Sequence, residues 1–238
     1  MSKEVIQRIM NKDVKLIQKM KLSDLGIHVE FNEDDIMKAK AILIGPKDTP
    51  YENGILYFLI EFPKEYPYKP PKIGYLSHSR YRIHPNLYVG KSCDNHLGKV
   101  CLSSINTWSG PKWTPVMHLG SVLLSIQSIL DNNPIQNEPG YENMDDWRNK
   151  IYNRIVEYNT YEYLILRNGF DIHPRFKSFC PEINDHLTKN KKEILENMKD
   201  LSEKHKVIEN IHTSIYRINC RTDYNKLYND LKLKFDKI

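Results

Sequence analysis

The chain has 238 residues and 40% of them are hydrophobic, which is enough for a substantial core in one large or two small domains. Its net charge of +5 is too small to indicate a nucleic-acid-binding protein, and the absence of a run of eighteen apolar residues argues against a membrane segment. The four cysteines, at positions 93, 101, 180 and 220, lack the spacing of a secreted disulfide framework, so we expect a cytoplasmic or nuclear protein.

An amphipathic helix is predicted at the start of the chain. Its apolar stripe consists of Val5, Ile9, Val14, Ile17 and Met20. The opposite face carries Lys12, Lys15 and Lys19, in a stretch of 21 residues that holds six Lys/Arg against two acids. This beginning lacks the apolar centre of a signal peptide, so we do not expect secretion. The basic face is either a solvated surface or a contact for an acidic partner.

The next region predicts an antiparallel meander of four strands. In residues 27–31 and 37–43 apolar residues occur at every second position, and the turn between these stretches predicts a hairpin. Residues 55–62 and 73–76 give the third and fourth strands. Four prolines between the last two strands fix an extended loop around Tyr66 and Tyr68. The two tyrosines are either core residues or part of a contact surface.

The remainder of the chain is predicted to be helical. Residues 116–130 have helical spacing and almost no charge, which indicates a buried central helix, and an amphipathic helix follows from Trp147 to a stop signal at Asn168-Gly169. Beyond it, three further stripes predict three helices: Ile194, Leu195, Met198 and Leu201; Ile208, Ile211 and Ile215; Leu227, Leu231 and Phe235. With 14 Lys/Arg against 11 Asp/Glu after position 169, these helices indicate a packed appendage. We therefore expect two regions, 1–168 and 169–238.

Cys101 is the candidate nucleophile. It follows Gly98 and precedes Leu102, a pattern in which the glycine lets the backbone turn and the leucine anchors it, so the sulfur is expected to face solvent. No serine-histidine-aspartate series surrounds it, which favours a thiolate that carries a group over one that cuts a bond. Asn86 lies upstream and, on residue type alone, is equally a turn-former after Pro85.

Several motifs together resemble the ubiquitin-conjugating enzymes. They are His84-Pro85-Asn86, Cys101-Leu102, Trp113-Thr114-Pro115 and, upstream in the family's order, residues 45–54 and 62–72. Residues 102–111 and 137–142 most resemble the larger Z-type members with C-terminal extensions, and the resemblance covers roughly residues 3–168. It implies the α+β fold of that family: a four-stranded antiparallel meander with flanking helices, followed here by a helical extension over 169–238 that packs on the 1–168 catalytic core.

The resemblance also implies a reaction. Cys101 would accept ubiquitin or a ubiquitin-like protein from an activating enzyme as a thioester and pass it to a substrate lysine or a ligase, with no cofactor of its own because the activating enzyme consumes the ATP. Asn86 would stabilise the oxyanion, hold the loop, or both. Glu138, at the family's gate position, would orient and deprotonate the acceptor lysine, unless it is only a solvated loop carboxylate.

The resemblance assigns roles to further residues. The structural motif is His84, Pro85 and Trp108, with His84 expected to be a structural histidine rather than a base. The ligase contacts are Phe62, Pro63, Trp113, Thr114 and Pro115. The contacts for the activating enzyme are Arg8, Lys12 and Lys15.

Cys93 is the rival nucleophile, because it lies closer to Asn86 in sequence, as in most of the family. Gly98, Leu102 and Trp108 align with Cys101, so we favour an insertion before Cys101. Two alternatives to the enzyme remain. One is a catalytically silent variant that binds ubiquitin or scaffolds a ligase, against which Asn86 and Cys101 argue. The other is an interaction module held together by zinc, with Cys93 and His96 among the zinc ligands. A bound zinc ion would occupy the thiolate that the transfer reaction needs, so we expect no metal.

Overall fold

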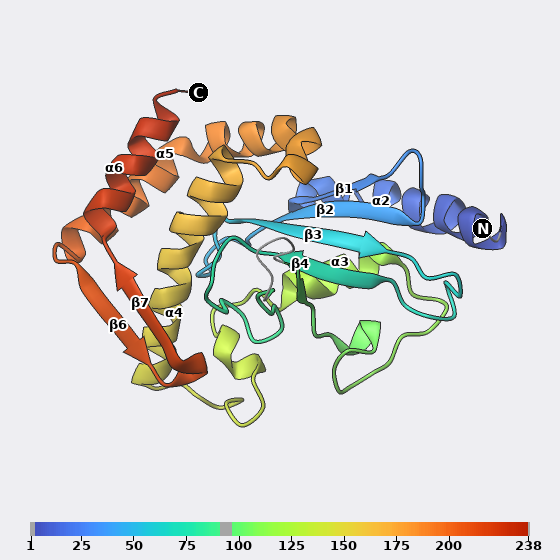
Figure 1. The fold of residues 1–238 in the computed structure, drawn as a ribbon, viewed down its shortest axis with the longest axis horizontal. Helices are drawn as coiled ribbons and strands as arrows, with labels where there is room; N and C mark the ends of the chain where they lie inside the picture. The colour runs from blue at the N-terminus through green and yellow to red at the C-terminus, as the bar shows by residue number, and fades with distance from the viewer. Residues whose placement is uncertain (1–2, 91–96, 238) are drawn as a thin grey trace. The chain divides into compact units, whose positions relative to one another are not determined.

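The structure, a computed structural model, describes residues 3–90 and 97–237 and divides them into two compact units (Figure 1). The first contains residues 3–44, 56–77, 86–90 and 97–130, and the second contains residues 45–55, 78–85 and 131–237. Residue 168 is therefore not a boundary between these units. No helix in the described ranges is both long and apolar enough to cross a bilayer.

The first unit is built on a five-stranded sheet whose strands follow chain order. They are β1 (Ile27–Phe31), β2 (Lys38–Ile44), β3 (Ile55–Glu61), β4 (Lys72–Leu76) and β5 (Leu97–Lys99). The pairs β1–β2, β3–β4 and β4–β5 are antiparallel. The four predicted strands are confirmed, whereas β5 was missed because three residues are too few for an alternating pattern to show.

Gly98 lies inside β5, not at a turn. A Cβ atom on this residue would lie 1.5 Å from the carbonyl oxygen of Tyr88, so only glycine allows the two backbones to approach so closely. The prediction that Gly98 provides a sharp turn before Cys101 is wrong. Its role is to let β5 pack against the segment that follows Asn86.

The predicted first helix is present as three consecutive pieces, α1 (Lys3–Arg8), η1 (Ile9–Val14) and α2 (Lys15–Lys19). Val5 and Ile9 are buried as expected, but the later apolar positions are half-buried or exposed, and Asp13 is fully buried instead. The reason is that η1 is π-helical. A π-turn contains more residues than an α-turn, so it rotates every later position around the helix axis.

Two short helices and one longer helix complete the first unit: η2 (Leu22–Leu25), η3 (Ser103–Ile105) and α3 (Leu119–Ser128). Helix α3 is the predicted central helix, and its predicted apolar positions Leu119, Val122, Leu123 and Ile126 are buried. It begins later than predicted, because His118 and Ser121 form a capping box at its N-terminus. Val116 therefore lies before the helix and is 74% exposed.

The second unit is mainly helical. Its elements are η4 (Pro134–Asn137), α4 (Trp147–Asn159), η5 (Thr160–Phe170), η6 (Pro174–Phe179), α5 (Cys180–Lys204), β6 (Glu209–Thr213), η7 (Ile215–Arg217), β7 (Ile218–Thr222) and α6 (Tyr224–Phe235). The helix predicted from Trp147 continues from α4 into the π-helical η5 and ends at Phe170, close to the predicted stop.

The extension packs on this long helix. The rings of Tyr158 and Tyr224 meet edge to face with centroids 5.0 Å apart, and those of Phe170 and Phe235 do the same at 4.9 Å. Near them the amide of Asn159 lies 3.7 Å from the sulfur of Cys220. The apolar side chains of the extension are thus buried against α4 and η5 within one unit.

The prediction of a helix that carries Ile208, Ile211 and Ile215 in the extension is wrong. Residues 209–213 and 218–222 form an antiparallel hairpin, β6–β7 (Figure 1). Ile208, Ile211 and Ile215 have helical spacing, but burial alternates strictly along β7 and at the end of β6. A period of two with β-branched residues is typical of a strand, and here it prevails over the helical spacing of three isoleucines.

We expect that truncation after Asn168 strongly lowers the melting temperature of the protein or makes it insoluble. The cut removes Tyr224, which packs against Tyr158 of α4, together with the Phe170–Phe235 pair, and the loss of one buried aromatic side chain alone costs about 3–5 kcal/mol. Calorimetry on the truncated and full-length chains measures the effect. An unchanged melting temperature would contradict the packing described above.

Candidate active site around Cys101

Cys101 and Asn86 are joined by two hydrogen bonds. The backbone N–H of Cys101 donates to the carbonyl oxygen of Asn86 at 2.8 Å, and the side-chain Nδ2 of Asn86 donates to the carbonyl oxygen of Cys101 at 2.6 Å. A bridge between Leu87 and Val100 continues this pairing toward β5. The sequence places the two residues fifteen positions apart, and the fold brings them side by side.

The bond from Asn86 Nδ2 fixes the backbone at the candidate nucleophile. This observation favours the loop-holding role among the alternatives for Asn86. An amide nitrogen carries two N–H groups, so one bond to a carbonyl is compatible with a second role toward an oxyanion. The side chain is buried, where a hydrogen bond is stronger than in water.

The sulfur of Cys101 does not face solvent, because the residue is only 2% exposed. The expectation of an exposed thiol is therefore wrong. Leu102 and Ile105, which follow in sequence, are buried as well, so the chain after β5 turns into the core of the unit.

Thr107 holds the segment that follows Cys101, a role that the sequence did not reveal. Its Oγ1 accepts from the N–H of Leu102 at 2.9 Å and lies 2.8 Å from the carbonyl oxygen of Val100. The N–H of Thr107 also donates to the carbonyl of Leu102. These bonds close a tight loop directly after the cysteine. The only sequence signal was the position of Thr107 in the stretch before Trp108.

The three residues assigned to the structural motif lie in packed surroundings. His84 is fully buried, with its ring centroid 6.0 Å from that of Tyr51. Pro85 is buried and its carbonyl accepts a hydrogen bond from Arg82. Trp108 is half-buried and its carbonyl accepts from Lys112. This burial agrees with a structural histidine, since a general base has to reach its substrate.

Glu138 lies in the second unit and is held by two side chains. The hydroxyl of Tyr216, in the extension, donates to its Oε2 at 2.5 Å, and the guanidinium of Arg82 lies 3.7 Å from the same oxygen. Burial and the bond to Glu138 raise the pKa of Tyr216, so its hydroxyl remains a donor. Glu138 is thus an oriented carboxylate rather than a freely solvated one.

Tyr216 is itself fixed from several sides. The guanidinium of Arg82 lies 4.4 Å from the centre of its ring, and the ring of Tyr152 meets it edge to face at 6.1 Å. Tyr216 and Arg217 both have a left-handed backbone with φ of 53°. For residues other than glycine this conformation costs about 1–2 kcal/mol each, so the tip of the hairpin is held in a strained shape by its contacts.

The candidate ligase contacts differ in exposure. The ring of Phe62 stacks with that of Phe31, meets that of Tyr66 edge to face and is 2% exposed. Trp113 is 7% exposed, and its Nε1 donates to the carbonyl of Pro67. These two side chains support the surface from below, and little of either one is accessible to a ligase. The exposed part consists of Thr114 and Pro115, and Pro63 is half-buried. Tyr68 and Val116 are further exposed apolar residues, whereas Tyr66 lies in the core.

The basic residues of the first helix are tied to the loop before α3. Arg8 donates to the carbonyls of Pro115 and Met117, and Lys12 donates to that of Val116, whereas Lys15 is exposed and donates to Oδ1 of Asn11. The candidate contacts for the activating enzyme and part of the candidate ligase surface therefore form one connected structure.

The buried carboxylate of Asp13 completes this connection. It accepts hydrogen bonds from the hydroxyl of Tyr66 and from the N–H of Leu119, both at 2.7 Å to Oδ1. Burial raises its pKa, and these bonds with the nearby Arg8 oppose that rise. Asp13 thus links the first helix, the proline-rich loop and the start of α3.

Cys93, the rival nucleophile, and His96, a candidate zinc ligand, lie outside the described residues. The rival nucleophile and the zinc set that includes them therefore stay sequence predictions.

The sequence model of the ubiquitin-conjugating enzyme family matches residues 9–160. Ubiquitin-conjugating enzyme E2 Z of Danio rerio is 40% identical over 138 residues, which cover 57% of this chain and 40% of that protein. Putative ubiquitin-conjugating enzyme E2 39 of Arabidopsis thaliana is 46% identical over 121 residues, which cover 49% of this chain and 36% of that protein.

Each match therefore spans less than half of the curated relative. Among solved structures, the E2 domain of a ubiquitin-conjugating enzyme of Toxoplasma gondii is 25% identical with a TM-score of 0.46, covering 63% of this chain and 97% of that one. The family match includes Asn86 and Cys101 and extends over more than half of the sequence. This chain belongs to the ubiquitin-conjugating enzyme family and is similar to its Z-type members.

Proposed function

We propose that this protein accepts ubiquitin or a ubiquitin-like protein as a thioester on Cys101 and passes it to a lysine, directly or through a ligase. The observation that carries the proposal is the pair of hydrogen bonds between Asn86 and Cys101, which sets an amide donor beside the candidate nucleophile. In charging, the Cys101 thiolate attacks the thioester carbonyl of the modifier, and the thiolate of the activating enzyme leaves. The protein then needs no cofactor of its own.

In the second half of the reaction an amine attacks the new thioester. An acceptor lysine has a pKa of about 10.4 and is mostly protonated at neutral pH, so a carboxylate that orients it and takes its proton accelerates the step. Glu138 is the candidate for this role. Its orientation by Tyr216 and Arg82 supports the assignment, because a fixed carboxylate pre-arranges the acceptor.

The partners follow from the same scheme. They are the modifier, an activating enzyme, a ligase and substrate proteins, in the cytoplasm or nucleus. Lys15 and the exposed residues around Pro115 and Val116 are the surfaces that we assign to the activating enzyme and the ligase.

A second candidate function is favoured by the burial of Cys101. A catalytically silent member would bind ubiquitin or scaffold a ligase without carrying a thioester, and a thiol that is 2% exposed fits that reading. One experiment distinguishes the two functions. The protein is incubated with activating enzymes, ATP and a panel of modifiers, and an adduct that disappears with reductant supports the enzyme. Failure of every modifier to charge the protein would support the silent member.

The role of Tyr216 can be tested by a double-mutant cycle. We expect Tyr216→Phe to slow discharge of the thioester to free lysine about tenfold, because a hydrogen bond to a charged group is worth about 1.5–3 kcal/mol. The phenyl ring keeps the contacts with Arg82 and Tyr152. The same substitution in a Glu138→Ala background should have no further effect.

Charging is the internal control for this cycle, since it does not use Glu138 in the proposed scheme. Equal slowing by Tyr216→Phe in both backgrounds would show that the tyrosine acts on the fold rather than on the carboxylate.

A further inference from the structure

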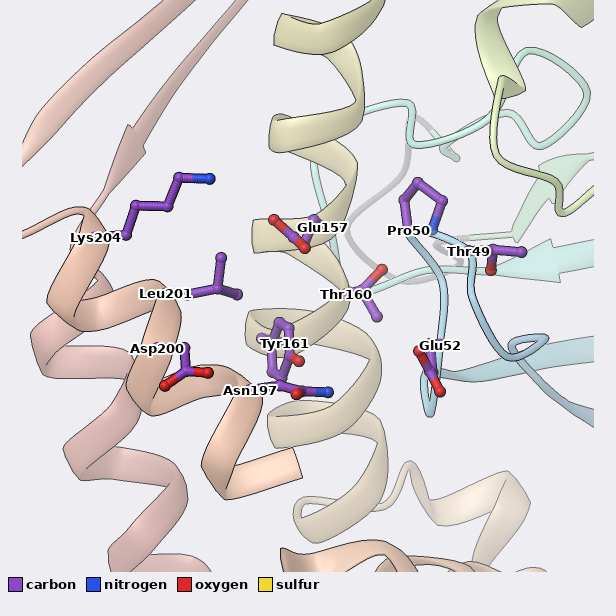
Figure 2. A pocket seen from close by; sticks show the side chains of 10 residues that line it. All are labelled: Thr49, Pro50, Glu52, Glu157, Thr160, Tyr161, Asn197, Asp200, Leu201 and Lys204. Atoms are coloured by element: carbon purple, nitrogen blue, oxygen red, sulfur yellow. The ribbon is translucent and has the colours of Figure 1, made fainter. Parts of the chain in front are cut away.

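A cavity of about 320 Å³ lies in the second unit, lined by residues to which the proposed reaction gives no role (Figure 2). Three parts of the chain line it. One is the face of α4 and η5 that carries Glu157, Thr160 and Tyr161, another is the end of α5, and the third is the segment 49–52. The volume is at the lower end of the range for sites that bind small molecules or single side chains.

The charges of the cavity are unbalanced. Glu52, Glu157 and Asp200 contribute three carboxylates, and Lys204 contributes the one ammonium among the lining residues. Glu52 and Glu157 are half-buried, and burial raises the pKa of both carboxyl groups. Within the described ranges, no hydrogen bond or ion pair reaches the carboxylates of Glu157 and Asp200. Glu52 accepts from the N–H of Asp48, and the charges of Lys204 and Arg154 oppose the rise in the pKa of Glu157, so the acidic excess of the cavity is only partly compensated.

Thr160 gives a second and independent observation. The residue is 1% exposed, and its Oγ1 has no hydrogen-bond partner in the described part of the chain. Figure 2 shows its side chain directed from the helix toward Pro50 and Glu52. Buried hydroxyl groups in folded proteins almost always have a partner, so an unpaired one at the wall of a cavity points to a ligand that supplies it.

The remaining wall is partly apolar, with Thr49 and Asn197 as its polar members. The ring of Tyr161 is buried, and the side chains of Leu201 and Pro50 border the same space. Such walls suit a chain of methylene groups, and the acceptors suit a head with several N–H donors. A metal ion fits less well, because no three acidic, histidine or cysteine side chains in the described ranges are grouped closely enough to hold one.

We propose that this cavity binds an alkyl ammonium or guanidinium group. The carboxylates of Glu157 and Glu52 attract the cationic head electrostatically, Thr160 adds a neutral acceptor, and Tyr161 and Leu201 contact the stem. Such a group comes either from a lysine or arginine side chain of another protein or from a free polyamine. The proposal is independent of the chemistry at Cys101.

Two probes distinguish these sources by nuclear magnetic resonance on the full-length protein. N-acetyl-arginine methylamide represents a protein side chain, and spermidine represents a free polyamine. We expect saturable chemical-shift changes at the amides of Glu52, Thr160 and Asp200 for at least one probe. If the natural ligand is a side chain of another protein, the arginine derivative should bind at least as tightly as spermidine. If the natural ligand is a free polyamine, spermidine should bind about tenfold more tightly than the arginine derivative.

Matched variants test the residues. The double variant Glu52→Gln with Glu157→Gln should weaken binding at least tenfold, whereas Glu196→Gln, an exposed carboxylate on α5 outside the cavity, should leave it unchanged. Melting curves confirm that each variant is folded. The proposal is overturned if neither probe gives saturable shifts at these amides, or if Glu196→Gln weakens binding as much as the double variant does.

Discussion

Cys101→Ala is expected to abolish the reductant-sensitive adduct between this protein and its modifier. Cys101→Ser should still form an adduct, more slowly, and that adduct should survive thiol because it is an ester. The reason is that a thiolate is the attacking group in charging, and an alanine side chain can form neither a thioester nor an ester. Charging reactions analysed by electrophoresis with and without reductant measure both outcomes.

The other cysteines provide the controls. Cys93→Ala and Cys180→Ala should charge like the parent protein. Cys220 is a poor nucleophile, because burial raises the pKa of its thiol to about 11. Loss of charging in Cys93→Ala with retention in Cys101→Ala would contradict the alignment that places an insertion before Cys101.

The parts of the fold that the sequence predicted well are those in which one short pattern decides the structure. The alternation in residues 27–31 and 37–43 specifies a hairpin, and the uncharged stretch that contains Leu119 and Ile126 specifies a buried helix. The Asn86–Cys101 pair was found through the motifs around it, and the fold joins the two residues by backbone and side-chain bonds.

The errors arise where a second pattern competes with the first. Residues 208–215 fit both a helical spacing and a strand, and pairing with β7 decides between them. In the first helix, the π-helical piece η1 displaces the apolar stripe and buries Asp13, which no local spacing predicts. The exposed thiol was expected from Gly98, but that glycine serves the close approach of Tyr88.

Contacts between distant parts of the sequence were not predictable at all. Tyr216 reaches Glu138 across 78 positions, from a hairpin tip whose left-handed backbone has no signal in its residue types. Asp13 bonds to Leu119 across 106 positions. Asp13 was an ordinary acid in the sequence and Glu138 was singled out only through the family resemblance, and the fold alone shows which groups hold each carboxylate.

Asn86→Ala is expected to slow discharge of the thioester to free lysine about a hundredfold, since removal of one oxyanion donor costs about 3 kcal/mol. Charging should be affected much less, because its nucleophile is a thiolate, which attacks a thioester more readily than a mostly protonated amine does. Single-turnover discharge of the preformed thioester measures the first effect, and initial charging rates measure the second. Asn86→Asp should resemble the alanine variant, because a carboxylate cannot donate.

Thr107→Val separates the oxyanion role of Asn86 from its loop-holding role. Both residues hold the chain next to Cys101, but Thr107 does so through Val100 and Leu102 and has no amide to donate. Loss of its hydrogen bonds should lower stability by about 1–3 kcal/mol. If Asn86 only holds the loop, Thr107→Val will slow discharge as much as Asn86→Ala does. If the amide also stabilises the oxyanion, Asn86→Ala will slow discharge at least tenfold more than Thr107→Val does, even where the two variants are equally stable.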